Sequence, residues 1–477
     1  MAAPIEAGKP PVQGAARPAR AALWFGLGLY FNSALLLLAT PIFTRLLSSE
    51  AYGQVVLYTS WAQVLTIFGT LSLSSGVFNN AMLDFPGETD GYMTSMLGLT
   101  LVSTLVTMAV MAVLMLVWRD VTTLGPTLLG FMGLQMFFNA AFLLWQAKER
   151  FQYRYKAVVG AGIAGSVLGV GGAMWLVPYL PQWQVQVRIM LPLLPPMIVG
   201  AIVLALLLMR SHRLYNPVYW RYALGISLTL IPHYGAQALL QQVDRFAVDA
   251  YVGRAAVGAY GLAAAVASGI TLFWTAINTV WAPWMLRRLK AEDSAAVVPI
   301  ATRIVAAVTL LSLAVMFAAP EIVRFLAPPS YGQAVLVLPW MLLTSVAQFA
   351  QSICLTVQLF HKRARWITAV SLLAAVWAVG LNVWLVPSLG IVSASVIATS
   401  SQLLLLVLHA ALLRTAGYTL PLKMMPVLAL LALGAACAEL CRFLGDQLVL
   451  RAALLAASML ALGALAWQMR RLQRRRA

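Results

Sequence analysis

Charged residues and cysteines are both scarce in this chain of 477 residues. Only 10% of its residues are Asp, Glu, Lys or Arg, whereas a soluble domain carries about 25%. The three cysteines, Cys354, Cys437 and Cys441, lie in apolar stretches, and two thiols on one helix are too few ligands for a metal site. The shortage of charge argues against a soluble protein, and the cysteines favour neither a disulfide framework nor a metal centre.

Acidic residues are the rarer charged class, because 14 Asp and Glu stand against 32 Lys and Arg, which gives a net charge of +18. Such a charge can indicate a nucleic-acid partner. Here the basic residues form short clusters between apolar stretches and no continuous patch, which argues against nucleic acid. The chain is 62% hydrophobic, with a mean hydropathy of +0.86, so membrane lipid is predicted to be its main solvent.

A membrane-spanning helix needs about 20 apolar residues. The segmentation predicts an all-α polytopic membrane protein with about 14 transmembrane helices. The first stretch is too long for a signal-peptide core, so it is predicted to be an uncleaved span after a tail at 1–20. The predicted spans are 21–44, 53–80, 93–118, 124–146, 157–178, 189–208, 222–246, 257–284, 303–320, 334–359, 366–387, 390–413, 424–441 and 449–469.

Basic residues alternate between the predicted loops. By this segmentation, 24 of the 32 Lys and Arg lie in the two termini, in the loops after even-numbered spans or, for Arg303, at the boundary of such a loop. Because Lys and Arg mark the cytoplasmic side, both termini are predicted to be cytoplasmic. An error of one span would exchange the basic and neutral loops downstream, so the alternation also supports the count as far as the twelfth span.

Two short motifs recur at nearly the same offset. Ala51-Tyr52-Gly53 recurs as Ala259-Tyr260-Gly261 after 208 residues, and Trp175-Leu176-Val177-Pro178 recurs as Trp384-Leu385-Val386-Pro387 after 209 residues. The first pair lies at the start of the second and eighth predicted spans, and the second pair lies at the end of the fifth and eleventh. Each pair therefore occupies the same place in two successive blocks of six spans. The repeat therefore predicts two copies of one six-helix bundle, in parallel orientation because six is even.

The repeat also divides the chain. We expect an N-terminal bundle at 21–208, a cytoplasmic linker at 209–221, a second bundle at 222–413, two appended helices at 424–469 and a basic tail at 470–477. Parallel repeats of this kind place a substrate site between the halves and allow alternating access. The alternative is a duplicated scaffold without transport.

Three motifs resemble segments of bacterial polysaccharide flippases. They are Pro41 to Arg45 with Tyr52-Gly53, Asp244-Arg245 with Val257-Gly258-Ala259-Tyr260, and Leu381 to Pro387 with Gly390-Ile391. These flippases export O-antigen or exopolysaccharide units within the multidrug, oligosaccharidyl-lipid and polysaccharide exporter superfamily. The resemblance covers roughly residues 20–415. One departure is Asn79-Asn80, which stand where many relatives carry a basic residue, so the location of an anion-binding charge stays open.

The resemblance implies transport of an undecaprenyl-pyrophosphate-linked oligosaccharide from the cytoplasmic to the outer leaflet of a bacterial inner membrane. It implies no cofactor. A coupling ion and a polysaccharide polymerase stay open as further partners, beside the lipid-linked oligosaccharide and the membrane lipids.

The seventh predicted span carries a polar stripe. His233, Gln237, Gln241 and Asp244 lie at i, i+4, i+8 and i+11, on one helix face, with Arg245 at its edge. A polar stripe in a span cannot face lipid, because its polar groups would lack partners. We predict that it lines a substrate cavity. The alternative is a set of hydrogen bonds between helices.

Other polar residues are weaker candidates for substrate binding. Arg245 either binds the lipid pyrophosphate or pairs with Asp244, and Arg45 is predicted to be a rim residue that attracts phosphate. Trp274 and Asn278 share a face of the eighth span, where an indole and an amide either contact a sugar or simply pack. Glu439, an acid within a span, is a functional candidate unless it pairs locally with Arg442.

Three rival functions stay open beside the polysaccharide flippase. An integral membrane glycosyltransferase usually needs a sizeable aqueous loop, and the sequence shows no paired carboxylates, Ser/His/Asp set or phosphate-binding loop. A drug or cation antiporter of the same superfamily would need buried acids, for which Asp244 and Glu439 qualify. The third rival is a flippase for the peptidoglycan precursor.

Overall fold

The computed structural model describes residues 16–74, 76–117, 122–211, 213–361, 364–445 and 447–474, and these residues are almost entirely helical and form no strand. The helices are α1 (Ala16–Leu46), α2 (Ser49–Thr70), α3 (Gly76–Asp84), α4 (Thr89–Val117), α5 (Pro126–Phe151), α6 (Tyr155–Leu176), α7 (Gln184–Arg210), α8 (Pro217–Tyr251), α9 (Arg254–Lys290), α10 (Ser294–Phe317), α11 (Ala319–Leu326), α12 (Ala334–Phe360), α13 (Ala364–Leu389), α14 (Ile391–Thr415), α15 (Met424–Leu444) and α16 (Leu448–Arg474). Three short 3₁₀ helices are η1 (Val177–Tyr179), η2 (Pro181–Trp183) and η3 (Pro329–Tyr331). The predicted all-α architecture is confirmed.

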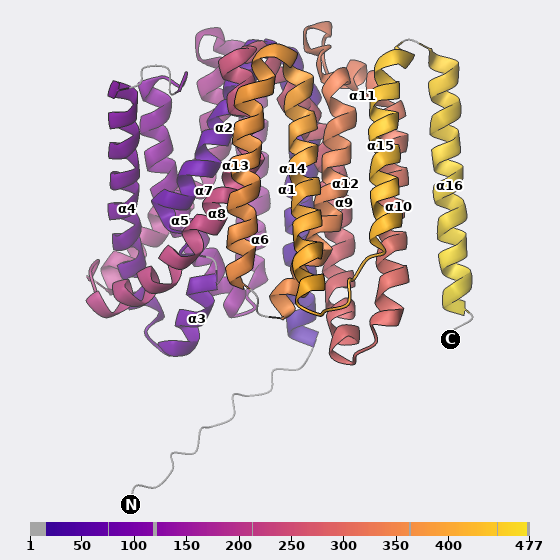
Figure 1. The fold of residues 1–477 in the computed structure, drawn as a ribbon. Coiled ribbons are helices and arrows are strands. Elements are labelled where there is room, and N and C mark those ends of the chain that lie inside the picture. The colour runs from indigo at the N-terminus through magenta and orange to yellow at the C-terminus, as the bar shows by residue number, and fades with distance from the viewer. Residues whose placement is uncertain are drawn as a thin grey trace, which may run out of the picture.

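Twelve of the described helices are long and apolar enough to cross a membrane. The two other long helices, α2 and α8, are more polar. The described ends of the chain, the start of α1 and the end of α16, lie on the same side of the helix layer (Figure 1). The protein is thus an all-α polytopic membrane protein, as the sequence predicts.

The predicted span 53–80 is wrong as a single helix, because α2 ends at Thr70 and a separate α3 begins at Gly76. Leu71 and Ser72 have left-handed φ angles of 49° and 50°. The carbonyl oxygen of Gly69 accepts hydrogen bonds from the hydroxyls of Ser103, at 2.6 Å, and Thr104, at 3.0 Å. Two α4 side chains therefore satisfy a carbonyl that a continuing helix would use itself.

The predicted tails also differ from the structure where they can be compared. α1 begins at Ala16 and α16 runs to Arg474, so the predicted tail residues 16–20 and 470–474 are helical. The remaining parts of the predicted tails, 1–15 and 475–477, lie outside the described residues.

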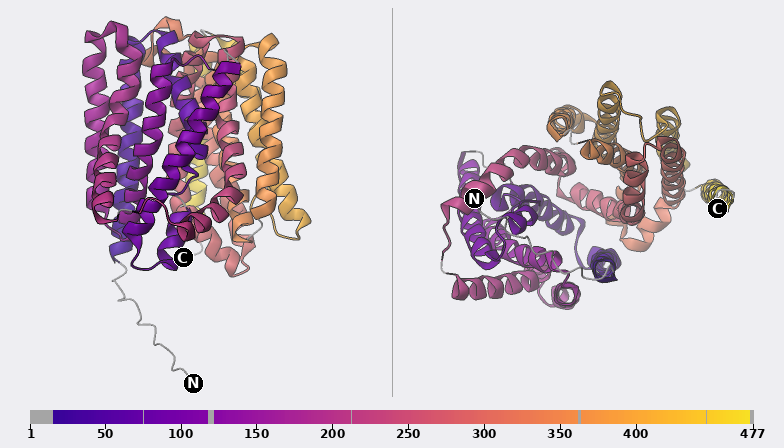
Figure 2. Two further views of the ribbon diagram at one scale, coloured as in Figure 1. Left: turned by 90° about the vertical axis from the view of Figure 1, so that its left-hand side faces the viewer. Right: turned by 90° about the horizontal axis from the view of Figure 1, so that it is seen from below.

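The helices gather into two groups with one main joint. In the first group α7 packs on α5 and α6, and α1 packs on α6. In the second group α12 packs on α9 and α14, and α13 packs on α8 and α14. The most extensive packing between the groups is that of α2 on α9. Seen from below, the purple helices lie on one side and the orange and yellow helices on the other (Figure 2).

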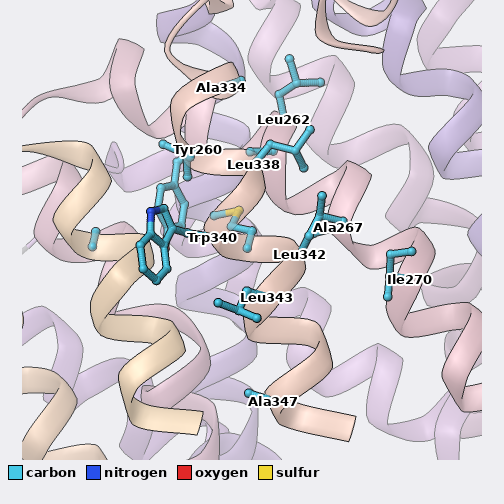
Figure 3. Packing of buried hydrophobic residues seen from close by; sticks show 14 of the residues in the cluster. Tyr260, Leu262, Ala267, Ile270, Ala334, Leu338, Trp340, Leu342, Leu343 and Ala347 are labelled. Atoms are coloured by element: carbon cyan, nitrogen blue, oxygen red, sulfur yellow. The ribbon is translucent and has the colours of Figure 1, made fainter. Parts of the chain in front are cut away.

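Buried apolar side chains fill the second group around α9 and α12. Tyr260 and Leu262 of α9 and Leu338 and Leu342 of α12 are fully buried in this cluster (Figure 3). Because lipid is as apolar as leucine, close packing rather than removal from water holds such helices together. The packed α9–α12 contact therefore supports α9, the second group's side of the joint.

Helix α8 contacts both groups. Its N-cap Asn216 accepts hydrogen bonds from the backbone amides of Val218 and Tyr219, which fixes the start of the helix. Its first turns bond to α3 and α4 through Tyr222 and Trp220, whereas its later turns bond to α13 through His233 and Gln237. Pro232 lies between these two parts and removes one helical hydrogen bond. α8 therefore packs on both groups, with its first part on the first group and its later part on the second.

The last two helices lie outside the two groups, at the edge of the molecule (Figure 1). α15 packs on α10 and α12, and α16 packs on α10. Arg451 of α16, 3% exposed, donates two hydrogen bonds of 2.7 Å to the carboxylate of Glu321 in α11. This ion pair, in which the arginine is buried and the carboxylate is partly exposed, anchors α16 to the second group.

Candidate functional site

Two adjoining cavities lie between the helix groups, and together they are called the central cavity. The larger has a volume of about 590 Å³ and is lined by α1, α2, α6, α7 and α9. The smaller, of about 270 Å³, is lined by α2, α7, α8 and α9. They share five lining residues, which are Tyr52, Val55, Thr59, Arg188 and Ala265. The central cavity is therefore bounded by helices from both groups.

Arg188 contributes a positive charge from α7 to both parts of the central cavity. Its guanidinium lies over the ring of Phe43, 4.0 Å from the ring centroid. Its Nε is buried without a hydrogen-bond partner, and within the described chain no carboxylate lies at salt-bridge distance. A partly buried guanidinium with an unpartnered buried Nε and no anion is costly, so this position is suited to an anionic ligand.

The sequence analysis missed Arg188. It placed the residue just before a span at 189–208, because the uninterrupted apolar run begins there. The structure shows α7 beginning at Gln184, so Arg188 lies one turn inside the helix. A usable signal was present, because an isolated Arg directly before an apolar run falls inside the helix whenever that helix extends a turn beyond the run.

Arg245 contributes a second positive charge, from α8, to the smaller part of the central cavity. Its Nη1 donates to the carbonyl oxygen of Gln241 and, at 3.1 Å, to Oε1 of Gln242. Gln242 in turn donates from Nε2 to Oε1 of Gln63 on α2, at 2.7 Å. The structure therefore brings the predicted Arg245 into the cavity and adds two amides, Gln63 and Gln242, that sequence reasoning did not select.

Asp244 lies beside Arg245 but is committed to other partners. Its Oδ2 accepts a hydrogen bond from the hydroxyl of Tyr260, and its Oδ1 accepts one from the Arg245 backbone amide at 2.9 Å. The nearest Arg245 guanidinium nitrogen is 3.5 Å from Oδ1, and Asp244 is 7% exposed. The predicted pair of Asp244 with Arg245 is thus present as a long contact, which leaves most of the guanidinium donors for another acceptor.

The remaining members of the predicted stripe point elsewhere. Nδ1 of His233 lies 3.1 Å from the hydroxyl oxygen of Ser371 on α13, and Nε2 of Gln237 donates to the same oxygen at 3.0 Å. These are the hydrogen bonds between helices that the sequence left as the alternative. Gln241 contributes its backbone carbonyl to Arg245. The lining of the central cavity includes Gln242 and Arg245 of α8 but none of these three side chains.

The two candidates on α9 lie beside the central cavity. Their neighbour Thr271 lines it. Trp274 is 9% exposed and stacks on Phe349 of α12, with 5.3 Å between ring centroids. Asn278 is partly buried one turn further along α9. The contact of Trp274 with Phe349 is a packing contact, which is the simpler of the two alternatives for that residue.

Arg45 joins the two groups at the end of α1. Its Nη1 donates to the carbonyl oxygen of Pro41 at 2.9 Å, and its Nη2 donates to that of Phe325 in α11 at 2.7 Å. Nearby, the hydroxyl of Thr44 donates to the carbonyl oxygen of Leu326. The predicted rim residue therefore takes part in a contact between the groups.

Glu439 forms the local ion pair that the sequence left as an alternative. Its Oε2 accepts a hydrogen bond from Nη1 of Arg442 at 2.9 Å. Its Oε1 accepts one from the indole of Trp340 on α12, at 3.1 Å. Both carboxylate oxygens are therefore engaged, and the contacts attach α15 to α12.

The two groups meet most closely at the start of α2 and α9. A Cβ added at Gly53 would lie 2.1 Å from the carbonyl oxygen of Arg254, and one added at Gly258 would lie 2.0 Å from that of Ser49. The hydroxyl of Tyr331 also donates to the carbonyl oxygen of Leu47 at 3.1 Å. These contacts hold α2 and α9 together beside Tyr52 and Gly261, two lining residues of the central cavity.

Comparison with known proteins gives a family and a fold. The sequence model of the polysaccharide biosynthesis protein family matches residues 42–319. No curated protein sequence matches the chain at a significant level.

Solved structures of transporters resemble most of the chain at low sequence identity. The lipid II flippase MurJ, in an inward closed conformation, has 9% identity and a TM-score of 0.64, and the match covers 94% of this chain and 99% of MurJ. An inward-facing multidrug resistance MATE family transporter of the MOP superfamily has 14% identity and a TM-score of 0.54, covering 81% of this chain and 95% of that one. A MOP superfamily transporter from Pyrococcus furiosus has 13% identity and a TM-score of 0.52, covering 84% and 96%. These likenesses establish the transporter fold.

Proposed function

The chain belongs to the polysaccharide biosynthesis protein family, and from this premise we propose that it flips an undecaprenyl-pyrophosphate-linked oligosaccharide from the cytoplasmic to the outer leaflet of a bacterial inner membrane. Family and fold are those of a MOP superfamily flippase or transporter. The observation that carries the proposed substrate is the presence of two arginines in the same cavity, Arg188 from α7 of the first group and Arg245 from the part of α8 that packs on the second group.

The two arginines suit a diphosphate. A guanidinium presents several N–H donors in a plane, which matches the oxygens of a phosphate. The unpartnered Nε of Arg188 and the free donors of Arg245 are available for such a ligand. Because the cavity lies between apolar helices, attraction between these charges and a diphosphate is stronger than it would be in water.

Polar groups around the arginines suit the sugars attached to a diphosphate. Thr59, Gln63 and Gln242 line the smaller part of the cavity, and Tyr58 and Ser268 line the larger part. Hydroxyls and amides of this kind exchange hydrogen bonds with sugar hydroxyls without requiring charge. We infer that the larger part, next to the arginines, receives the first sugars.

Alternating access follows from the joint between α2 and α9. We infer that the contacts around Gly53, Gly258 and Arg45 close one end of the cavity. By the predicted orientation, with both termini cytoplasmic, this closed end faces the outside. Release of the substrate then requires the two groups to part at these contacts, as rigid halves rocking about the central site.

A flippase for the peptidoglycan precursor is the second candidate. The observation that favours it is the likeness to MurJ over 94% of this chain. Both functions would use the same arginines for a lipid-linked diphosphate, so only the attached glycan distinguishes them. The antiporter is less favoured, because Asp244 and Glu439 are both engaged by hydrogen bonds.

The decisive experiment compares lipid-linked glycans in cells with and without this protein. We expect loss of the protein to leave undecaprenyl-linked oligosaccharide on the cytoplasmic leaflet, inaccessible to a periplasmic glycosidase, and to abolish surface polysaccharide. Re-expression of the wild type should restore both. Accumulation of the peptidoglycan precursor instead would favour the second candidate, and unchanged pools of both lipids would refute the proposed function.

A further inference from the structure

A separate groove lies on the second helix group, between α10 and α15. It has a volume of about 500 Å³ and is called the α10–α15 groove. α10 and α15 lie side by side here, near the edge of the molecule (Figures 1 and 2). Its lining residues are Pro299, Thr302, Arg303 and Ala306 of α10, with Lys423, Pro426, Ala429, Leu430 and Leu433 on the α15 side. None of these residues lines the central cavity.

The groove is polar at one end and apolar along the rest. Lys423 immediately precedes α15, and its backbone amide donates to the hydroxyl of Thr302 at 3.1 Å. This bond places Lys423 at the level of Thr302 and the adjacent Arg303. Further along the groove, Ala306, Ala429, Leu430 and Leu433 leave an apolar wall. Two cations therefore lie at one end of an open, mainly apolar groove.

Neither cation at this end of the groove is neutralised. Within the described chain, no carboxylate lies within salt-bridge distance of Arg303 or Lys423. Lys423 is exposed and Arg303 is partly buried. Their positive charge is available to an anion that approaches along the surface of the protein.

The length of the groove matches one leaflet of a membrane. Ten residues separate Lys423 from Leu433, and at 1.5 Å per helical residue they span about 15 Å. The apolar core of a bilayer is about 30 Å thick, so this distance is about half of it. Lys423 lies at the start of α15, the predicted cytoplasmic end of that span, so from there the apolar wall reaches roughly the middle of the membrane.

We propose that the α10–α15 groove binds an anionic phospholipid of the cytoplasmic leaflet. The phosphate lies between Arg303 and Lys423, and one acyl chain lies along Ala429, Leu430 and Leu433. Basic pockets between transmembrane helices at the cytoplasmic side are suited to anionic head groups. The site takes its sidedness from the orientation proposed above, but it does not depend on which lipid-linked glycan is transported.

The test measures lipid retention by the purified full chain in a mild detergent. Phosphatidylglycerol and phosphatidylethanolamine with identical acyl chains are added in equal amounts, and bound lipid is counted by native mass spectrometry. We expect the wild type to retain phosphatidylglycerol preferentially, and to lose this preference at high salt. The double variant R303Q/K423Q should bind phosphatidylglycerol about 30-fold more weakly, which corresponds to about fivefold for each cation.

Two further variants separate the head group from the acyl chain. Arg414 lies in the last turn of α14 and does not line the groove. Arg414→Gln therefore removes a cation outside the groove and should leave the retention of phosphatidylglycerol unchanged. Ala429→Trp fills the apolar wall without changing charge, and should reduce retention of phosphatidylglycerol at least tenfold. Equal retention of the two lipids by the wild type, or undiminished retention by R303Q/K423Q, would overturn the proposal. Displacement of the lipid by millimolar glycerol 3-phosphate would also overturn it, because a site for the free anion does not need the apolar wall.

Discussion

Gly53 on α2 and Gly258 on α9 face each other's helix backbones across the joint between the two helix groups. Each would place an added Cβ about 2 Å from a carbonyl oxygen of the opposite helix, that of Arg254 for Gly53 and that of Ser49 for Gly258. The contact is reciprocal, so the two helices meet in the same way from both sides. Because real Cβ atoms do not approach this closely, any larger residue at either position must push the groups apart.

Replacing Gly258 by Ala should therefore weaken the closed end of the central cavity. We expect G258A to lower crosslinking between cysteines introduced at Arg45 and Phe325, in a background without the native cysteines, by several-fold. Gly269 lies further along α9 with open space around its Cβ position, so G269A is the matched control and should leave crosslinking unchanged. Equal crosslinking in G258A and G269A would contradict the role given to this joint.

Substitution of Arg188 by a neutral residue should lower transport without lowering the stability of the protein. A charge that lacks a partner in the free protein destabilises it, and replacement by a neutral residue relieves that cost. We expect R188Q to lower flipping of the lipid-linked oligosaccharide at least tenfold in complemented cells, while the melting temperature of the purified protein stays equal or rises. R188K should retain part of the activity, because it keeps the charge but loses the planar donors. A lowered melting temperature together with normal transport would mean that Arg188 is structural.

Much of the fold could be predicted from the sequence because each long helix leaves its own apolar run. The break in the predicted span 53–80 could not, because the hydroxyls of Ser103 and Thr104 that bind the Gly69 carbonyl come from another helix. The short helix α11 was missed for a related reason, since eight residues are too few to show a membrane-spanning pattern.

The candidate site could be predicted only in part. Helical periodicity placed His233 and Gln237 on one face of α8, and both do contact the same residue, Ser371. Periodicity does not say which neighbour that face meets, and the neighbour is α13. Arg245 was selected from the same stripe and lines the cavity, whereas its partner across the cavity, Arg188, lies in another helix whose start the apolar run concealed.

Two glutamines of α8 should respond differently to the same change. Gln242 lines the central cavity and bonds to Gln63 of α2, whereas Gln237 bonds to Ser371 of α13. We expect Q242L to lower transport at normal protein levels. Q237L should keep transport and lower the free energy of unfolding by about 0.6 kcal/mol, the average value of a hydrogen bond between membrane helices. The measurement pairs a surface-polysaccharide assay with thermal unfolding of each variant. Loss of transport in Q237L with normal transport in Q242L would instead favour the predicted polar stripe as the cavity lining.

Acid should loosen the attachment of α16. The Arg451 guanidinium, through its hydrogen bonds, holds the pKa of Glu321 below its usual value, and Glu321 lies in α11 outside the spanning helices. A carboxyl group whose pKa is lowered on folding stabilises the protein above its unfolded pKa of about 4.3, and this contribution is lost as the pH falls through the folded value.

We therefore expect the melting temperature of the purified wild type to be constant near neutral pH and to fall below about pH 4. E321Q should be less stable than the wild type at neutral pH by about 1–2 kcal/mol, which is less than for a fully buried pair because the Glu321 side chain is 45% exposed. The variant should also lose this part of the acid sensitivity, because it has no proton to gain at that position. Asp293, paired with Arg288 at the surface, supplies the control: D293N removes an exposed pair and should change the acid response little. If E321Q and the wild type respond to acid alike, the Glu321–Arg451 pair does not anchor α16.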